Sequence, residues 1–238
     1  LIKKYTMINA VMKFIGGLFF FLVCVINSLS AYNLRQVTNS DGLTSSAVLS
    51  LLQDSNGFLW MGTCDGVNIY DGTKAYSWNG WGQLNLSGYI IEEILETHDG
   101  VIWVQTNYGL SKVDKEKRLV VDYPQFKGSY MMVKNELGDL FFFSSSNLLY
   151  AFNEKKQEFY RLPIGTLDRE DIVNLYVNEH YLIIFLKNEI IYYQMKHSPE
   201  GEYTLSTINT SEKTEVRYGF GDKNQVYWLD KDYNLFGY

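Results

Sequence analysis

The chain has 238 residues, of which 46% are hydrophobic and 16% aromatic, and its formal net charge is −6. An apolar content this high excludes an intrinsically disordered chain, and the acidic balance excludes general electrostatic binding of nucleic acid or anionic lipid. Its two cysteines, Cys24 and Cys64, are too few for a disulfide framework or a Cys-x-x-Cys metal site.

Residues 1–31 are predicted to be a signal peptide, helical in its apolar part. Lys13 supplies the positive charge, an apolar run follows it, and Ser28 and Ser30 are the small residues that precede a cleavage site. The run is shorter than the roughly 20 apolar residues that a membrane-spanning helix needs. We therefore expect export, with residues 32–238 as the mature part; an uncleaved anchor is the alternative.

The rest of the sequence repeats itself about every 42 residues. The repeats cover approximately residues 43–80, 88–126, 129–163, 170–209 and 214–238. Each places a bulky apolar side chain at the corresponding position, namely Trp60, Trp103, Phe141, Ile184 and Trp228. One such unit cannot bury both of its faces alone, so these side chains are predicted to pack between successive repeats.

Turn residues divide the first repeat into short runs of strand-forming residues. Asp side chains bond nearby backbone N–H groups and Gly accepts a positive φ, so an Asp-Gly pair between apolar runs favours a hairpin. The positions assigned to this pattern are Asp54, Gly57, Gly62, Asp65, Gly66, Asp71 and Gly72. The start of the pattern, at residues 54–57, lacks the distal Glu of a calcium loop, so it is predicted to be a turn and not a metal site.

This periodicity predicts an all-β fold, a β-propeller of four-stranded antiparallel blades with about five blades present. Residues 87–97 taken alone would also suit a short helix, but the alignment of the repeats assigns residues 91–95 to a first strand. A lone strand at residues 33–37 leaves open a closed five-bladed ring, in which that strand would complete the fifth blade.

The string from Asp41 to Gly72 resembles the two-component regulator propeller repeat. It has the leading D-G-L, a strand ending in Q-D, then G-x-L-W-x-G-T, then D-G-[LV]-x-x-Y-D-G. Cys64 stands where an acidic residue is usual, and in the second repeat Gln105 replaces the glycine of W-x-G-T. The later repeats keep the spacing of the pattern but not its residues.

The resemblance implies the extracytoplasmic sensor region of a Bacteroidetes hybrid two-component histidine kinase, of which this chain would be an N-terminal fragment. It implies part of a ring of about seven blades on the periplasmic side of the inner membrane. The second propeller, the transmembrane segment and the kinase would be missing partners, and a homodimer is allowed. It further implies an oligosaccharide ligand and control of polysaccharide utilisation.

No catalytic, metal or cofactor motif is present in the sequence, so no catalytic residue, metal or cofactor is predicted and the chain is not expected to be an enzyme. Sugars are commonly bound by aromatic rings in loops, and Trp78, Trp81 and Tyr89 lie in a glycine-rich linker between the first two repeats. These three are the predicted ligand-binding residues, with cover of a blade edge as the alternative. The rival functions are an exported propeller lyase or glycosidase and a truncated, non-functional remnant.

Overall fold

The computed structural model describes residues 35–78, 86–210, 214–222 and 225–237. The predicted signal peptide therefore lies outside the described residues. The chain divides into two units, Leu1–Gln36 and Val37–Tyr238, and all the sheets belong to the second.

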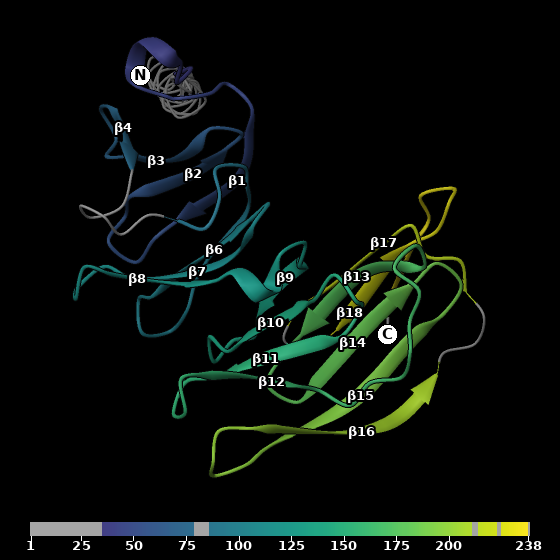
Figure 1. Ribbon diagram of the computed structural model, residues 1–238. Coiled ribbons are helices and arrows are strands. Elements are labelled where there is room, and N and C mark those ends of the chain that lie inside the picture. The colour runs from purple at the N-terminus through teal and green to yellow at the C-terminus, as the bar shows by residue number, and fades with distance from the viewer. Residues whose placement is uncertain (1–34, 79–85, 211–213, 223–224, 238) are drawn as a thin grey trace, which may run out of the picture. The chain divides into compact units, whose positions relative to one another are not determined.

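Five antiparallel sheets follow one another along the chain (Figure 1). The first sheet contains β1 (Val48–Gln53), β2 (Leu59–Thr63), β3 (Gly66–Tyr70) and β4 (Ala75–Trp78). The second contains β5 (Ile91–Glu96), β6 (Ile102–Thr106), β7 (Gly109–Asp114) and β8 (Leu119–Tyr123). The third contains β9 (Tyr130–Lys134), β10 (Leu140–Phe143), β11 (Leu149–Asn153) and β12 (Glu158–Arg161). The fourth contains β13 (Ile172–Val177), β14 (Tyr181–Leu186), β15 (Ile190–His197) and β16 (Tyr203–Thr210). The fifth contains β17 (Tyr218–Gly221), β18 (Val226–Leu229) and β19 (Leu235–Gly237).

The first strands of the sheets contact one another in order, β1 with β5, β5 with β9, β9 with β13 and β13 with β17. In each sheet the hydrogen-bonded order is the chain order, so the first strand is at one side and the last strand at the other. Sheets that meet through their first strands in this way are the blades of a propeller. The predicted all-β fold is confirmed, with three strands described in the fifth blade; only two short 3₁₀ turns, at Asn39–Asp41 and Pro124–Phe126, interrupt the strands in the described residues.

Apolar clusters fill the spaces between successive blades. Trp60 packs with Ile91 and Ile94 of the second blade, and Trp103 packs with Phe142 and other residues of the third. These side chains are at most 2% exposed. The burial of these side chains between blades thus contributes to the stability of the fold.

Ile184 and Trp228 occupy the equivalent strands but face the preceding blade. Trp60 belongs to the second residue pair from the turn of its hairpin, whereas Ile184 and Trp228 belong to the third. The turn of the fourth blade, residues 178–181, is one residue shorter than residues 54–58 in the first, and a shift of one residue turns a side chain to the other face of a strand. Ile184 therefore joins the cluster between the third and fourth blades, and Ile183 faces the fifth.

Two ambiguous segments have definite structures. Residues 91–96 form β5, which confirms the strand that the repeat alignment predicts over the helix. The lone strand predicted at residues 33–37 is wrong over its described part: residues 35–37 have no strand, and Val37 instead packs against the cluster of Leu43 and Met61. Among the described residues no N-terminal strand pairs with the fifth blade, so nothing there supports the closed five-bladed ring.

Glu93 is a carboxylate held between the first strands of two blades. Its Oε1 accepts a hydrogen bond from Ser50 Oγ at 3.0 Å, and the Ser50 hydroxyl oxygen accepts one from Ile94 N at 3.0 Å. Burial raises the pKa of Glu93, although these hydrogen bonds act in the opposite direction. The ionised form is therefore the less favourable one in the folded protein.

We expect Glu93→Gln to raise the melting temperature at pH 7 by roughly one to three degrees. A raised pKa means that the stability contribution is present below the unfolded pKa and is lost as pH rises through the folded pKa. The gain should therefore disappear when thermal unfolding is repeated near pH 3.5, where wild-type Glu93 is protonated. An equal gain at both pH values would contradict the assignment to the carboxylate.

Candidate functional site

One edge of the blades carries three kinds of segment: the turns between second and third strands, the linkers between blades, and the starts of the first strands. We call it the linker edge. The linker that ends at residue 90 is hydrogen-bonded to the turns on either side of it. Gly66 N donates to Tyr89 O at 2.7 Å, and Asn107 N donates to Ile90 O at 3.1 Å. The backbone that carries Tyr89 is therefore held between two blades.

The predicted ligand-binding residues have different surroundings. Trp78 is half-buried in β4, with its ring centroid 5.7 Å from that of Trp60, and it packs against the cluster between the first two blades. Trp81 lies outside the described residues. Tyr89 is 56% exposed at the linker edge. Of the two that are described, Tyr89 has the more accessible ring, and the assignment of all three residues to ligand binding remains a prediction.

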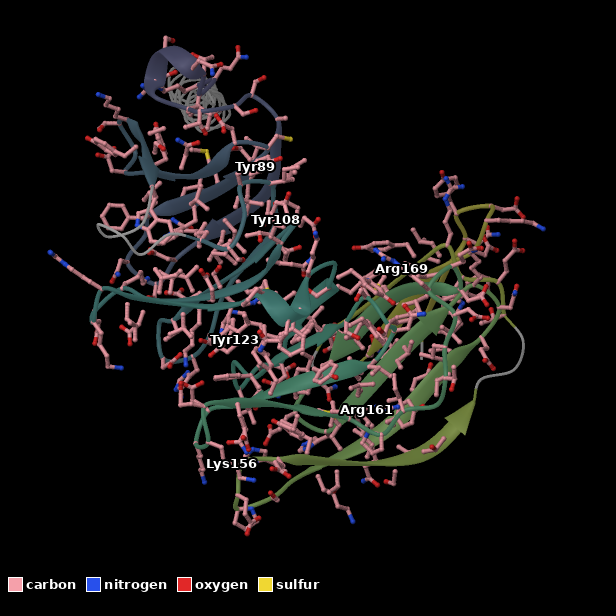
Figure 2. The ribbon with its side chains drawn as sticks, viewed as in Figure 1. Tyr89, Tyr108, Tyr123, Lys156, Arg161 and Arg169 are labelled. Carbon is pink, nitrogen blue, oxygen red and sulfur yellow. The ribbon has the colours of Figure 1, made fainter. Side chains whose placement is uncertain are left out.

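A second exposed tyrosine lies beside Tyr89 (Figure 2). Tyr108 is 43% exposed, and the two ring centroids are 6.4 Å apart with an interplanar angle of 51°. The Lys127 ammonium lies 4.7 Å from the centroid of the Tyr108 ring, a cation–π contact. We call Tyr89, Tyr108 and Lys127 the tyrosine–lysine site.

The turn that presents Tyr108 is fixed by Thr106. The Thr106 hydroxyl accepts a hydrogen bond from Tyr108 N at 3.2 Å and donates one to Gly109 O at 3.2 Å. Thr63 makes the same two bonds in the first blade, to Asp65 N and Gly66 O. The turn is thus a repeated structural element, on which the second blade places an aromatic ring.

A related pair joins β9 to the linker between the third and fourth blades. The Arg169 guanidinium lies 4.3 Å from the centroid of the Tyr130 ring, and Tyr130 Oη donates to Asn147 Oδ1 at 2.8 Å. Burial raises the pKa of Tyr130, although Arg169 opposes that effect. Tyr130 is half-buried, so this pair ties the linker to the third blade more than it offers a free surface.

Two open cavities, of about 610 and 410 Å³, lie at the linker edge of the fourth and fifth blades and share Asn188 and Glu215. Most of the residues that line them are of polar or charged type, among them Asp171, Lys187 and Arg217. Across the part of the chain that is described, no three His, Cys, Asp or Glu side chains are placed to hold a metal ion. No helix in that part is long and apolar enough to cross a membrane.

Residues 42–65 match the family described as Two component regulator propeller. The match falls on the first repeat, from which the sequence predicts this resemblance. No curated protein matches the chain.

Several solved structures have a similar fold. The extracellular domain ascribed to the hybrid two component system BT4673 of B. thetaiotaomicron is 19% identical, with a TM-score of 0.60, over 80% of this chain and 27% of that domain. The corresponding domain of BT3049 from the same organism is 18% identical, with a TM-score of 0.58, over 83% of this chain and 34% of that domain. The virginiamycin B lyase of Staphylococcus aureus is more distant, 11% identical with a TM-score of 0.50, over 86% of this chain and 72% of the lyase.

The family match confirms the predicted resemblance for the first repeat, and the solved structures confirm the propeller fold. The chain spans about a third or less of the length of the two sensor domains. At these identities the likeness concerns the fold, and the activity of the longer proteins is not thereby transferred to this chain.

The sequence analysis did not predict Tyr108 and Lys127 as ligand-binding residues. A usable signal exists, because residues 107–108 occupy the two-residue turn that residues 64–65 occupy in the first blade. An aromatic residue in that turn must lie at the same edge as the linker that contains Tyr89. The position of Lys127 over the ring depends on the path of the next linker, for which the sequence has no comparable pattern.

Proposed function

We propose that this chain is the ligand-sensing, extracytoplasmic part of a hybrid two component sensor, and that it binds an oligosaccharide at the tyrosine–lysine site. The observation that carries the proposal is the pair of exposed rings, Tyr89 and Tyr108, in adjacent loops of one edge. The resemblance to extracellular sensor domains supports the setting: an exported domain on the periplasmic side of the inner membrane.

The chemistry of the site suits a sugar. An aromatic face packs against the C–H groups of a sugar ring, and the phenol hydroxyls can donate and accept hydrogen bonds at its rim. The Lys127 ammonium adds a donor beside Tyr108. Binding would pass a conformational or dimerisation change to a kinase elsewhere in the full-length protein, and so regulate genes for polysaccharide utilisation.

We expect Tyr108→Ala to weaken oligosaccharide binding about tenfold or more, because stacked aromatic side chains dominate such contacts. The measurement is isothermal titration calorimetry against a panel of plant and host oligosaccharides. Tyr76→Ala is the matched control, since Tyr76 is a tyrosine 52% exposed on the outer strand β4, away from the linker edge.

The control should bind as the wild type does. Equal losses in both variants would indicate a general effect of removing a tyrosine, and no binding by the wild type across the panel would contradict the proposal. Chromatography of the same mixtures after incubation tests the rival enzyme function, for which we expect no cleaved or rearranged product.

A further inference from the structure

We call the contact between two successive blades a seam, and one second-strand position faces each of the four seams between the described blades. The first strands of the first four blades each have a β-bulge, and the second-strand residue that pairs at the bulge faces the next blade. These second-strand residues are Gly62, Gln105, Phe143 and Phe185.

Three of the four seams are apolar at this position. A Cβ on Gly62 would lie 2.6 Å from Ile91 Cγ2, so the first seam is closed by an isoleucine against a glycine. Phe143 packs in one cluster with Ile172, and Phe185 covers Gly219. An apolar residue or a glycine therefore occupies this second-strand position at three of the four seams between the described blades.

The second seam departs from that pattern. Gln105 is 3% exposed, and its Nε2 donates to Glu92 Oε2 at 2.9 Å and to Ser129 O at 3.0 Å. Two polar atoms remain without a partner there, Gln105 Oε1 and the hydroxyl of Ser129, which is 1% exposed. Unpaired buried polar atoms destabilise a fold, and they concentrate where function requires them.

The three polar residues of the second seam lie close in sequence to the three residues of the tyrosine–lysine site. Glu92 follows Tyr89 by three residues, Gln105 precedes Tyr108 by three, and Ser129 follows Lys127 by two. Each residue of the exposed site is therefore tied by a short stretch of backbone to one polar residue of the seam. Three separate segments bring both sets together.

We propose that Glu92, Gln105 and Ser129 form a hydroxyl-binding subsite of the tyrosine–lysine site, which takes the ring hydroxyls of the bound sugar. Gln105 Oε1 and the exposed Glu92 carboxylate accept hydrogen bonds, and the Ser129 hydroxyl both accepts and donates, so the subsite selects a ligand rich in hydroxyl donors. The two unpaired atoms are covered in this structure, so binding requires residues 127–129 to move outward. The inference rests on the proposed function and deepens it, because that movement would link sugar binding to displacement of the third blade.

The test compares two buried serines. Ser129→Ala removes a hydroxyl without a partner, so we expect the melting temperature without ligand to rise by about 2–4 °C. Ser111→Ala is the control, because the Ser111 hydroxyl donates to Asp122 Oδ1 at 2.6 Å and accepts from Ser87 N at 3.1 Å, and its loss should lower the melting temperature. Calorimetry with the panel oligosaccharide that the wild type binds best should show Ser129→Ala binding at least about fivefold more weakly.

Gln105→Met is a second variant for the binding measurement, since it keeps the length of the side chain and removes its amide, the Oε1 acceptor together with the Nε2 donor to Glu92 and Ser129 O; we expect a similar loss of affinity. If Ser129→Ala lowers the melting temperature as Ser111→Ala does, the hydroxyl has a structural partner and the inference is wrong. If Ser129→Ala binds as tightly as wild type while Tyr108→Ala does not, the subsite is wrong and the proposed function stands. If the wild type binds no oligosaccharide of the panel, both the proposed function and the subsite are wrong.

Discussion

Replacing Asp54 with alanine is expected to lower the free energy of unfolding by about 3 kcal/mol, because it leaves the buried Trp60 N–H without an acceptor and takes from the Lys115 ammonium one of its two carboxylate partners. The Asp54 side chain is 2% exposed, and its Oδ2 lies 2.9 Å from the Lys115 ammonium and 3.0 Å from Trp60 Nε1. Lys115 also pairs with Glu96 at 2.9 Å. The group joins the turn of the first blade to the second blade at the edge opposite the linkers.

Asp54 also fixes its own turn, since Oδ1 accepts hydrogen bonds from Asn56 N and Phe58 N. Asp71 is the matched control because it caps an exposed turn in the same way, through Thr73 N and Lys74 N. Asp71→Ala removes only turn bonds, so it should destabilise the protein much less. Urea unfolding followed by tryptophan fluorescence measures both variants, and equal effects would mean that the Lys115 and Trp60 contacts contribute little.

The effect of Asp54 should also depend on pH. Burial alone would raise the pKa of Asp54, but hydrogen bonds from Lys115, Trp60 and Phe58 N outweigh it and hold that pKa below its usual value of 3.8. A lowered pKa means that the stabilisation is present above the unfolded pKa and is lost as pH falls through the folded pKa. The difference between wild type and Asp54→Ala should therefore be full at pH 7 and smaller near pH 3.

The repeat pattern was sufficient to predict the propeller because turn chemistry and strand alternation are local properties. Asp54 and its turn residues specify one hairpin without reference to the rest of the chain. The pattern was less reliable for Ile184 and Trp228, because a turn shorter by one residue reverses the face of a strand while leaving the aromatic rhythm almost unchanged. Hydrophobic spacing alone cannot distinguish those two faces when both are buried.

The candidate site was harder to predict for a different reason. Tyr89 was identified because a large aromatic residue in a glycine-rich linker is unusual, but Tyr108 and Lys127 come from other turns and meet it only through the stacking of blades. Gln105 was noticed in the sequence as a departure from W-x-G-T. Its meaning depends on Ser129, which lies across the seam, so no local pattern could assign it.

Gly138→Ala is expected to destabilise the protein by about 3 kcal/mol or more, because two separate costs combine at one position. The residue has a φ of +85°, which L side chains rarely adopt, and a Cβ there would lie 2.3 Å from His98 N and 2.7 Å from His98 Cβ. His98 belongs to the corresponding turn of the second blade, so the added atom would push the second and third blades apart.

Gly57 separates the two costs. It occupies the equivalent turn of the first blade with a φ of +86°, but a Cβ there would have nothing within 4 Å. Gly57→Ala should therefore cost only the strain of a left-handed backbone, about 1–2 kcal/mol. Thermal and urea unfolding of the two variants side by side should show Gly138→Ala to be clearly the less stable. Equal losses would mean that the turns of the second and third blades are not in contact, and that the blades meet only through their first strands and the apolar clusters.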